Sequence, residues 1–141
     1  MSVKQRQKEI IEEFEVFRQW IDRYEHIIEL GKNLPKLNIE HKTDKNLIDG
    51  CQSKVWLHVS MQKGRIIFNA DSDTIIIKGI ISLLIKVLSN QTPNEIINAN
   101  LNFIEKIGLN QYLSPTRANG LMSMIKTMKQ HAITLISNSE R

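Results

Sequence analysis

The chain has 141 residues, of which 41% are hydrophobic and 24% are charged, and its formal net charge is +4. These values are typical of a soluble globular protein, and we expect residues 1–141 to form a single domain. The 19 basic residues are scattered among 15 acidic ones, a pattern that argues against nucleic acid as a partner. No apolar stretch reaches the length of about 18 residues that a membrane span requires, and the charged N-terminus is unlike a secretory signal. We therefore expect a cytoplasmic protein without a membrane partner.

Two amphipathic helices are predicted in the N-terminal part. Residues 4–17 have apolar side chains at helical spacing, and a second helix with the same pattern runs through about Leu30. Gly31 is expected to end this second helix. A polar loop follows from Leu34 to Ile48, in which we expect His41 to be exposed to solvent.

The period of the apolar residues changes to two after Val55, which predicts a half-buried β-strand. Lys63-Gly64 is typical of a tight turn, and Arg65 to Ala70 has the pattern of a second strand. The sequence therefore predicts an antiparallel hairpin. A short strand just before Cys51 would extend the sheet to three strands.

The segment from Thr74 to Leu88 is apolar on nearly every side, which predicts a helix in the centre of the domain. Asp71-Ser72-Asp73 offers an N-cap for this helix. Gly79 lies in its interior, where glycine lowers helix stability, so we expect it to permit a close approach of another backbone.

The remaining residues are predicted to be helical. Thr92-Pro93-Asn94-Glu95 resembles a capping box and starts a short helix to Ala99, and another helix runs from Leu101 to Ile107 and ends at Gly108. Ser114-Pro115 then begins a long helix to about Ile136. Together these elements predict an α+β fold, with several helices packed over a small antiparallel sheet.

Cys51 is the only cysteine, so the chain cannot form an internal disulfide, which favours a reducing compartment. A lone cysteine is most often a small buried hydrophobic residue. Here Asp49-Gly50 precedes it as a turn signal and polar residues follow it, so we expect the thiol to lie on a loop.

Other chemistry has little support in the sequence. One cysteine and four scattered histidines do not make a recognisable metal site, and the six isolated glycines form no phosphate-binding loop. A small cysteine hydrolase that pairs Cys51 with His58 is an alternative. However, His58 lies on the predicted strand, which would carry it away from the Cys51 loop.

Arg117 is unusual because it occupies the third position of the predicted final helix, where the helix dipole disfavours a cation. It could pair with a carboxylate such as Asp71 or Asp73. Alternatively, its guanidinium could face the thiolate of Cys51, and a fixed positive charge there would lower the thiol pKa.

Three segments together resemble the SufE family of sulfur-acceptor proteins, whose motifs occur here in the same order and at matching spacing. The first is Gly50-Cys51-Gln52-Ser53-Lys54-Val55-Trp56. The second is Asp71-Ser72-Asp73 followed by Ile77-Lys78-Gly79. The third is Leu113-Ser114-Pro115-Thr116-Arg117-Ala118-Asn119-Gly120-Leu121. The related CsdE proteins share these motifs, so the subgroup stays open.

The resemblance implies a fold like that of the cluster scaffold IscU and a role in iron–sulfur cluster assembly. Cys51 would take sulfur from the persulfide of a SufS-type cysteine desulfurase, stimulate that enzyme, and pass the sulfur to a SufB-type scaffold. The chain would act as a sulfurtransferase-like carrier, not as a stand-alone enzyme. It would hold no cofactor of its own, because the pyridoxal phosphate belongs to the desulfurase, and no metal, because it lacks the several cysteines that a scaffold needs to hold iron. A homodimer is left open.

The resemblance also implies which residues support Cys51. Arg117 would steady its anion, Asp73 would belong to the surrounding loop network or to a docking surface, and Gly50, Gln52 and Ser53 complete the motif. We expect the thiol to be sheltered in a shallow apolar pocket until docking. The rival hypothesis of a basic adaptor, in which Cys51 is structural, predicts that Cys51→Ala leaves function intact.

Overall fold

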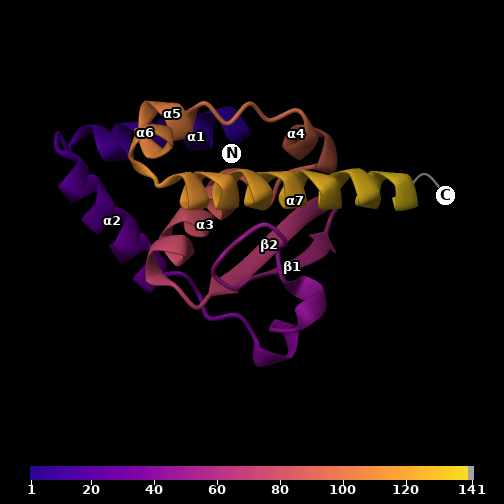
Figure 1. The fold of residues 1–141 in the computed structure, drawn as a ribbon. Helices are drawn as coiled ribbons and strands as arrows, with labels where there is room; N and C mark the ends of the chain where they lie inside the picture. The colour runs from indigo at the N-terminus through magenta and orange to yellow at the C-terminus, as the bar shows by residue number, and fades with distance from the viewer. Residues whose placement is uncertain (140–141) are drawn as a thin grey trace.

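The computed structural model describes residues 1–139 and shows an α+β fold (Figure 1). Its elements in chain order are α1 (Val3–Glu15), α2 (Trp20–Lys32), the 3-10 helices η1 (Ile39–His41) and η2 (Asp44–Asn46), β1 (Val55–Gln62), β2 (Arg65–Ser72), α3 (Ile75–Leu88), α4 (Pro93–Ile97), α5 (Phe103–Lys106), α6 (Leu109–Tyr112) and α7 (Pro115–Ser139). The C-terminal end of α7 projects away from the other elements. None of the helices in this part of the chain has the length and apolar character needed to cross a membrane.

The two strands form the predicted hairpin. They pair antiparallel from Val55↔Ser72 at the open end to Gln62↔Arg65 beside the turn. Lys63 and Gly64 both have positive φ, at 52° and 78°, as expected for a tight two-residue hairpin turn. The expected third strand is corrected to one isolated bridge, Leu47↔Trp56, because the chain turns at Asp49-Gly50 before a longer ladder can form.

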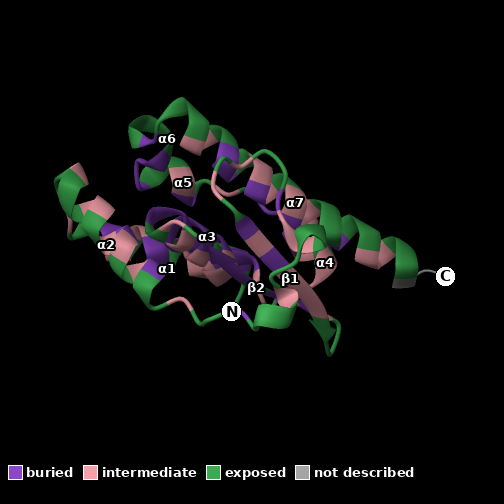
Figure 2. Cartoon of the chain, turned by 60° about the horizontal axis from the view of Figure 1, so that its bottom comes forward, coloured by how far each residue is buried: buried purple, intermediate pink, exposed green. Residues whose placement is uncertain are grey.

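Helix α3 lies at the centre of the hydrophobic core, as its apolar sequence predicts. Nine of its residues are buried, and α2 and β2 pack against it (Figure 2). A Cβ atom added at Gly79 would collide with the carbonyl of Ile27, and one added at Gly31 would lie 2.6 Å from the carbonyl oxygen of Ile75. The expectation that Gly79 permits a close backbone approach is therefore confirmed.

Several helix boundaries differ from the sequence prediction. Thr74 is the N-cap of α3 and its side chain makes no capping hydrogen bond, so Asp71-Ser72-Asp73 does not cap this helix. Gly108 ends α5, as predicted, but α6 follows it directly, because Gly108 adopts a left-handed conformation that lets the chain turn into a new helix. The predicted cap of α7 is present: the backbone N–H of Arg117 donates to Ser114 Oγ over 3.3 Å.

Candidate functional site

Cys51 lies in the loop that leads into β1, and the residue before it explains the shape of this loop. Gly50 has a φ of +88°, which residues with a side chain rarely adopt. A Cβ atom at Gly50 would also collide with the hydroxyl of Ser123 on α7. The glycine therefore lets the loop press against α7, and this brings the thiol close to that helix.

The thiol is half-buried beside a small cavity. Cys51 Sγ donates a hydrogen bond to the main-chain carbonyl of Gly120 over 3.6 Å. The cavity has a volume of about 120 Å³ and is lined by Cys51, Gln52, Ser53, Thr74, Ile77, Thr116, Arg117, Gly120 and Met124. The expected shelter is present, but its lining mixes polar and apolar side chains and is not mainly apolar. Burial raises the pKa of the Cys51 thiol above its usual value.

Arg117 lies in the first turn of α7 and lines the same cavity as Cys51. Within residues 1–139 its guanidinium has no hydrogen bond or ion pair, and neither Asp71 nor Asp73 is paired with it. The fold thus brings Arg117, whose side chain has no partner within residues 1–139, to the cavity beside the Cys51 thiol. Because the thiol pKa is raised by burial, the guanidinium does not hold Cys51 as a thiolate in this conformation.

A network of hydroxyl and carboxylate groups connects the Cys51 loop to the turn between β2 and α3. The hydroxyls of Ser53 and Thr74 are 2.7 Å apart, and Thr74 Oγ1 donates to Asp73 Oδ1 over 3.2 Å. Asp73 Oδ1 also accepts from the backbone N–H of Lys54 over 3.2 Å. Asp73 therefore belongs to the loop network, one of the two roles that the resemblance implies for it.

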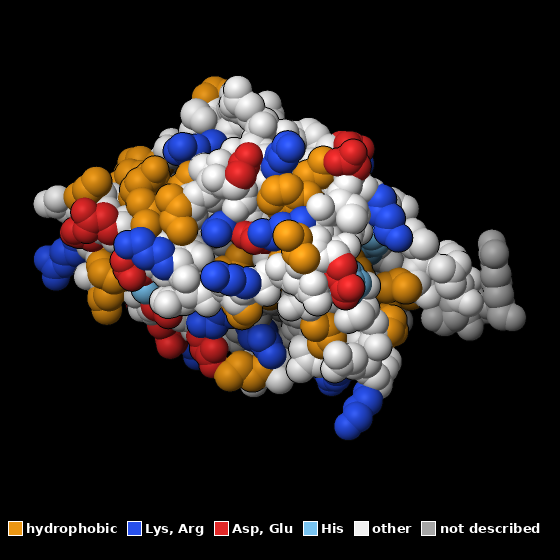
Figure 3. Space-filling model, turned by 90° about the horizontal axis from the view of Figure 1, so that it is seen from below, with side chains coloured by type: hydrophobic (Ala, Val, Ile, Leu, Met, Phe, Trp, Pro, Cys, Tyr) orange, Lys and Arg blue, Asp and Glu red, His pale blue; other side chains and the backbone are white. Residues whose placement is uncertain are grey.

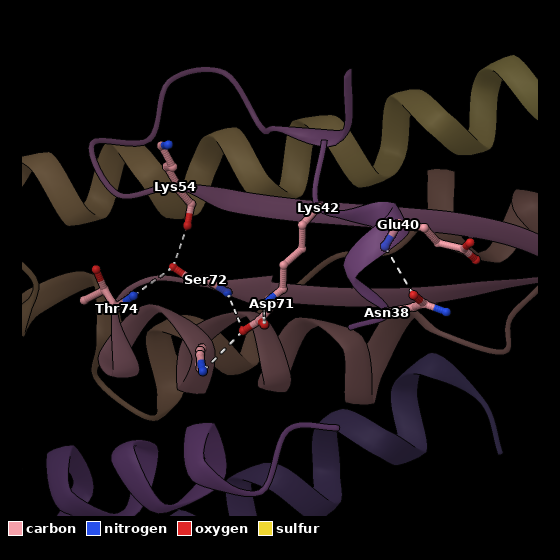
Figure 4. A network of polar contacts seen from close by, with 8 residues as sticks. Asn38, Glu40, Lys42, Lys54, Asp71, Ser72 and Thr74 are labelled. Atoms are coloured by element: carbon pink, nitrogen blue, oxygen red, sulfur yellow. Dashed lines mark hydrogen bonds and ion pairs between the residues drawn. The ribbon is translucent and has the colours of Figure 1, made fainter. Parts of the chain in front are cut away.

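Asp71 forms a second anchor beside this network. Its carboxylate is almost fully buried and lies 2.7 Å from the amine of Lys42 and 3.3 Å from that of Lys78. Figure 4 shows Lys42 reaching from the loop before the hairpin toward Asp71. Sequence reasoning missed this pair of contacts, because Lys42 lies in a polar loop where nothing singled it out.

The histidines lie away from the thiol. None of the four lines the Cys51 cavity. His58 on β1 instead stacks on His41, with the ring centroids 3.6 Å apart. The side chain of His41 is half-buried in this stack, so the expectation that His41 is exposed to solvent is wrong. The geometry therefore gives no support to a Cys–His hydrolase. Among residues 1–139 no group of three or more His, Cys, Asp or Glu side chains is placed to hold a metal ion.

Charge is distributed without one dominant patch over the face that Figure 3 shows. In the view from below, basic side chains are interspersed with acidic and apolar ones (Figure 3). This agrees with the scattered charges of the sequence and gives no indication of a continuous basic surface on that face.

The chain matches a known protein family over most of its length. Residues 8–132 match the family SufE, described as an Fe-S metabolism associated domain. The chain belongs to the SufE family. The match that shows the family covers most of the chain, including the Cys51 loop, the hairpin and most of α7.

Two relatives are SufE-like proteins. SufE-like protein 1, chloroplastic/mitochondrial, of Arabidopsis thaliana is 37% identical over 129 residues, which are 91% of this chain and 35% of that protein. An uncharacterised SufE-like protein of Rhizobium meliloti (strain 1021) is 38% identical over 129 residues, covering 88% of this chain and 92% of that protein. The chain therefore spans about a third of the plant relative and nearly all of the bacterial one.

A solved structure supports the fold. The solution structure of a hypothetical protein from Thermus thermophilus superposes with a TM-score of 0.76 over 94% of this chain and 96% of that one. The two sequences are 16% identical, so this likeness concerns the fold alone.

Proposed function

We propose that this SufE-family chain is a sulfur acceptor that takes persulfide sulfur from a SufS-type cysteine desulfurase onto Cys51. The observation that carries the proposal is the arrangement at one cavity: the only thiol of the chain lies half-buried beside a cavity that is also lined by Arg117, which has no hydrogen-bond or ion-pair partner for its side chain within residues 1–139. The absence of a second cysteine means that a persulfide on Cys51 could not be discharged as an internal disulfide.

The transfer is a displacement at sulfur. Cys51 loses its proton, and its thiolate attacks the outer sulfur of the persulfide on the desulfurase. A bond forms between Cys51 Sγ and that sulfur, the sulfur–sulfur bond of the donor breaks, and the donor cysteine leaves as a thiolate. No external oxidant or reductant is consumed, because the sulfur carries its oxidation state with it.

The neighbours of Cys51 have distinct parts in this step. The raised pKa keeps the free chain mostly in the unreactive thiol form, so we propose that docking on the desulfurase changes the surroundings of the sulfur. Arg117 then stabilises the thiolate and the persulfide anion. The Ser53–Thr74–Asp73 network and Gly50 hold the shape of the loop, and the exposed Gln52 lines the cavity.

The partners follow from this role. The pyridoxal phosphate that releases sulfur from cysteine belongs to the desulfurase, whose activity the chain stimulates by removing its product. We propose a SufB-type scaffold as the next acceptor, with the transfer taking place in the cytoplasm.

The proposal is tested by intact-mass analysis after the chain is mixed with a SufS-type desulfurase and free cysteine. The wild type should gain one or more sulfur masses that a reductant removes, and Cys51→Ser should gain none. Asn119→Ala, at an exposed position of α7 outside the cavity lining, keeps the thiol and its loop, serves as the matched control and should still be loaded. If the wild type gains no sulfur from an active desulfurase, the proposed function is wrong.

A further inference from the structure

Gly120 is the one glycine of the chain whose presence is not explained by a positive φ or by the close packing of two helices. Of the six glycines, three have positive φ, and Gly31 and Gly79 lie where α2 and α3 cross. Gly120 lies inside α7 with ordinary helical geometry. A Cβ atom there would have one heavy atom within 4 Å, apart from its own helix backbone and chain neighbours: Cys51 Sγ, at 3.7 Å.

Glycine in a helix interior destabilises the helix relative to alanine, so its presence at this position calls for a physical reason. The backbone conformation does not provide one. The distance of 3.7 Å is an ordinary van der Waals contact, so alanine would also be compatible with the thiol as it stands. What alanine would take away is part of the cavity of about 120 Å³ that Gly120 and Cys51 line together.

We infer that Gly120 keeps space for the second sulfur atom of a Cys51 persulfide, an inference that rests on the proposed function. A sulfur–sulfur bond is about 2 Å long, so the outer sulfur would lie within the cavity next to Sγ. A methyl group at position 120 would compete for that space. Gly120 would thus distinguish the two states of the cysteine: a methyl group there makes an ordinary contact with the thiol, at 3.7 Å, and would compete with the outer sulfur for the space directly beside Sγ.

The carbonyl of the same residue has a separate part. It accepts the S–H of Cys51 in the free chain. That proton leaves before the thiolate attacks, so the contact is given up when the new sulfur–sulfur bond forms, and the negative charge then lies on the outer sulfur in the cavity that Arg117 also lines. Gly120→Ala keeps the carbonyl and changes only the volume.

The test uses the purified chain and inorganic polysulfide, which transfers sulfur to a thiol without a protein partner. Persulfide on Cys51 is measured by intact mass for the wild type, Gly120→Ala and the control Asn119→Ala, which changes an exposed neighbour in the same helix turn. We expect Gly120→Ala to hold roughly tenfold less persulfide, the order of effect of adding one methyl group to a filled site. Asn119→Ala should equal the wild type.

A second readout excludes a general loss of the site. The thiolate of Cys51 is titrated by its ultraviolet absorbance, and the thermal unfolding of each variant is recorded. The thiol of Gly120→Ala should still titrate, with a pKa equal to or above that of the wild type because the added methyl group increases burial, so loading is compared at equal thiolate fraction. The variant should unfold at the same or a higher temperature. Gly120→Ser, which also adds a Cβ atom, should repeat the loss of persulfide.

Two results would overturn the inference. One is a wild type that takes no sulfur from polysulfide although its thiol titrates, since the cavity would then not house a second sulfur. The other is equal loading of Gly120→Ala and the wild type. Both differ from failure of the proposed function, in which the wild type is loaded by polysulfide but not by an active desulfurase.

Discussion

The amine of Lys42 lies 2.7 Å from Asp71 Oδ2, and this contact joins the loop before the hairpin to the end of β2. The backbone N–H of Ser72 donates to Asp71 Oδ1 over 2.8 Å, and Lys78 of α3 approaches the same oxygen. One buried carboxylate therefore connects three segments of the chain. Ser72 continues the connection, because its hydroxyl donates to the carbonyl of Lys54, three residues after Cys51.

Replacing Asp71 should destabilise the fold. Asp71→Asn keeps the shape of the side chain but leaves two partly buried lysine amines without their anion, and we expect a loss of about 2 kcal/mol in the free energy of unfolding. Urea denaturation measures it. Asp44→Asn, at an exposed position, is the control and should change the free energy by less than about 0.5 kcal/mol. Equal stabilities of the two variants would contradict the role given to Asp71.

The contacts of Asp71 also predict how the stability of the fold changes at acidic pH. Burial alone would raise its pKa, but the bonds from Lys42, Ser72 and Lys78 outweigh this, so the pKa lies below its usual value. The carboxylate then contributes its full stability above the unfolded pKa of about 3.9, and this contribution is lost as the pH falls toward the lower folded pKa. Melting temperatures between about pH 5 and pH 2 should fall less steeply for Asp71→Asn than for the wild type.

The His41–His58 stack predicts a second pH dependence of the stability of the fold, at a pH closer to neutral. Burial and the neighbouring His41 and Lys45 lower the pKa of His58, with Glu40 acting in the opposite direction. The neutral ring therefore stabilises the fold above the unfolded pKa of about 6.5, and this contribution is lost as the pH falls toward the folded pKa. His58→Phe keeps an aromatic partner for His41 and should show a smaller loss of melting temperature between about pH 7.5 and pH 5. An identical loss in both proteins would contradict this assignment.

The reactivity of the free thiol should be low at neutral pH. Because burial raises the pKa of Cys51, its alkylation rate by iodoacetamide should increase up to a higher pH than that of a free cysteine, whose pKa is about 8.5. The dependence of the alkylation rate on pH is measured by quenching the reaction at fixed times and determining the alkylated fraction by mass spectrometry, with N-acetylcysteine as the reference. A midpoint at or below that of the reference would show that the environment activates the thiol.

Arg117 should matter for sulfur transfer more than for the resting thiol. Arg117→Gln removes the guanidinium from the cavity but should leave the alkylation profile of Cys51 unchanged, since burial sets the thiol pKa. Loading from the desulfurase should fall roughly tenfold, the size of a lost hydrogen bond to a charged group. Arg117→Lys, which keeps the charge, should restore part of the rate. A parallel shift of the alkylation profile would instead show that Arg117 acts on the resting thiol.

The crossing of α2 and α3 should not tolerate a side chain at Gly79. Alanine there would place Cβ against the carbonyl of Ile27 and force the helices apart, and overpacking of this kind costs about 1–3 kcal/mol or more. Gly64→Ala is the comparison, because a Cβ at Gly64 has no neighbour within 4 Å and only its positive φ is unfavourable. Thermal unfolding should show Gly79→Ala as the less stable of the two.

The hairpin, α3 and the α7 cap could be predicted because each has a local signal. Alternation of apolar residues marks the strands, Lys63-Gly64 supplies the turn, and Ser114-Pro115 marks the start of α7. The close approach at Gly79 was also readable, since glycine in a buried helix needs a reason. The fold class followed from these elements, while the third strand did not form.

The contacts between distant segments could not be predicted in the same way. The Lys42–Asp71 pair and the His41–His58 stack both involve a loop whose path is set by tertiary packing. The sequence offered two environments for Arg117, and only the fold shows that its side chain lines the Cys51 cavity. Gly120 did carry a signal, a glycine inside a predicted helix, but its meaning depends on the thiol brought next to it.

The hairpin has its two ends in very different surroundings. Its open end, where Val55 pairs with Ser72, begins just after the Cys51 loop and runs into the Asp73–Thr74 turn, whereas Lys63 and Gly64 at its tip are exposed. Residues at the open end are thus directly connected along the chain to the residues of the site. The turn at the tip lies at the opposite end of the hairpin, so its length can change without moving the site. This makes the tip a suitable insertion point for an affinity tag or a fluorescent reporter in a chain whose only thiol must stay unlabelled.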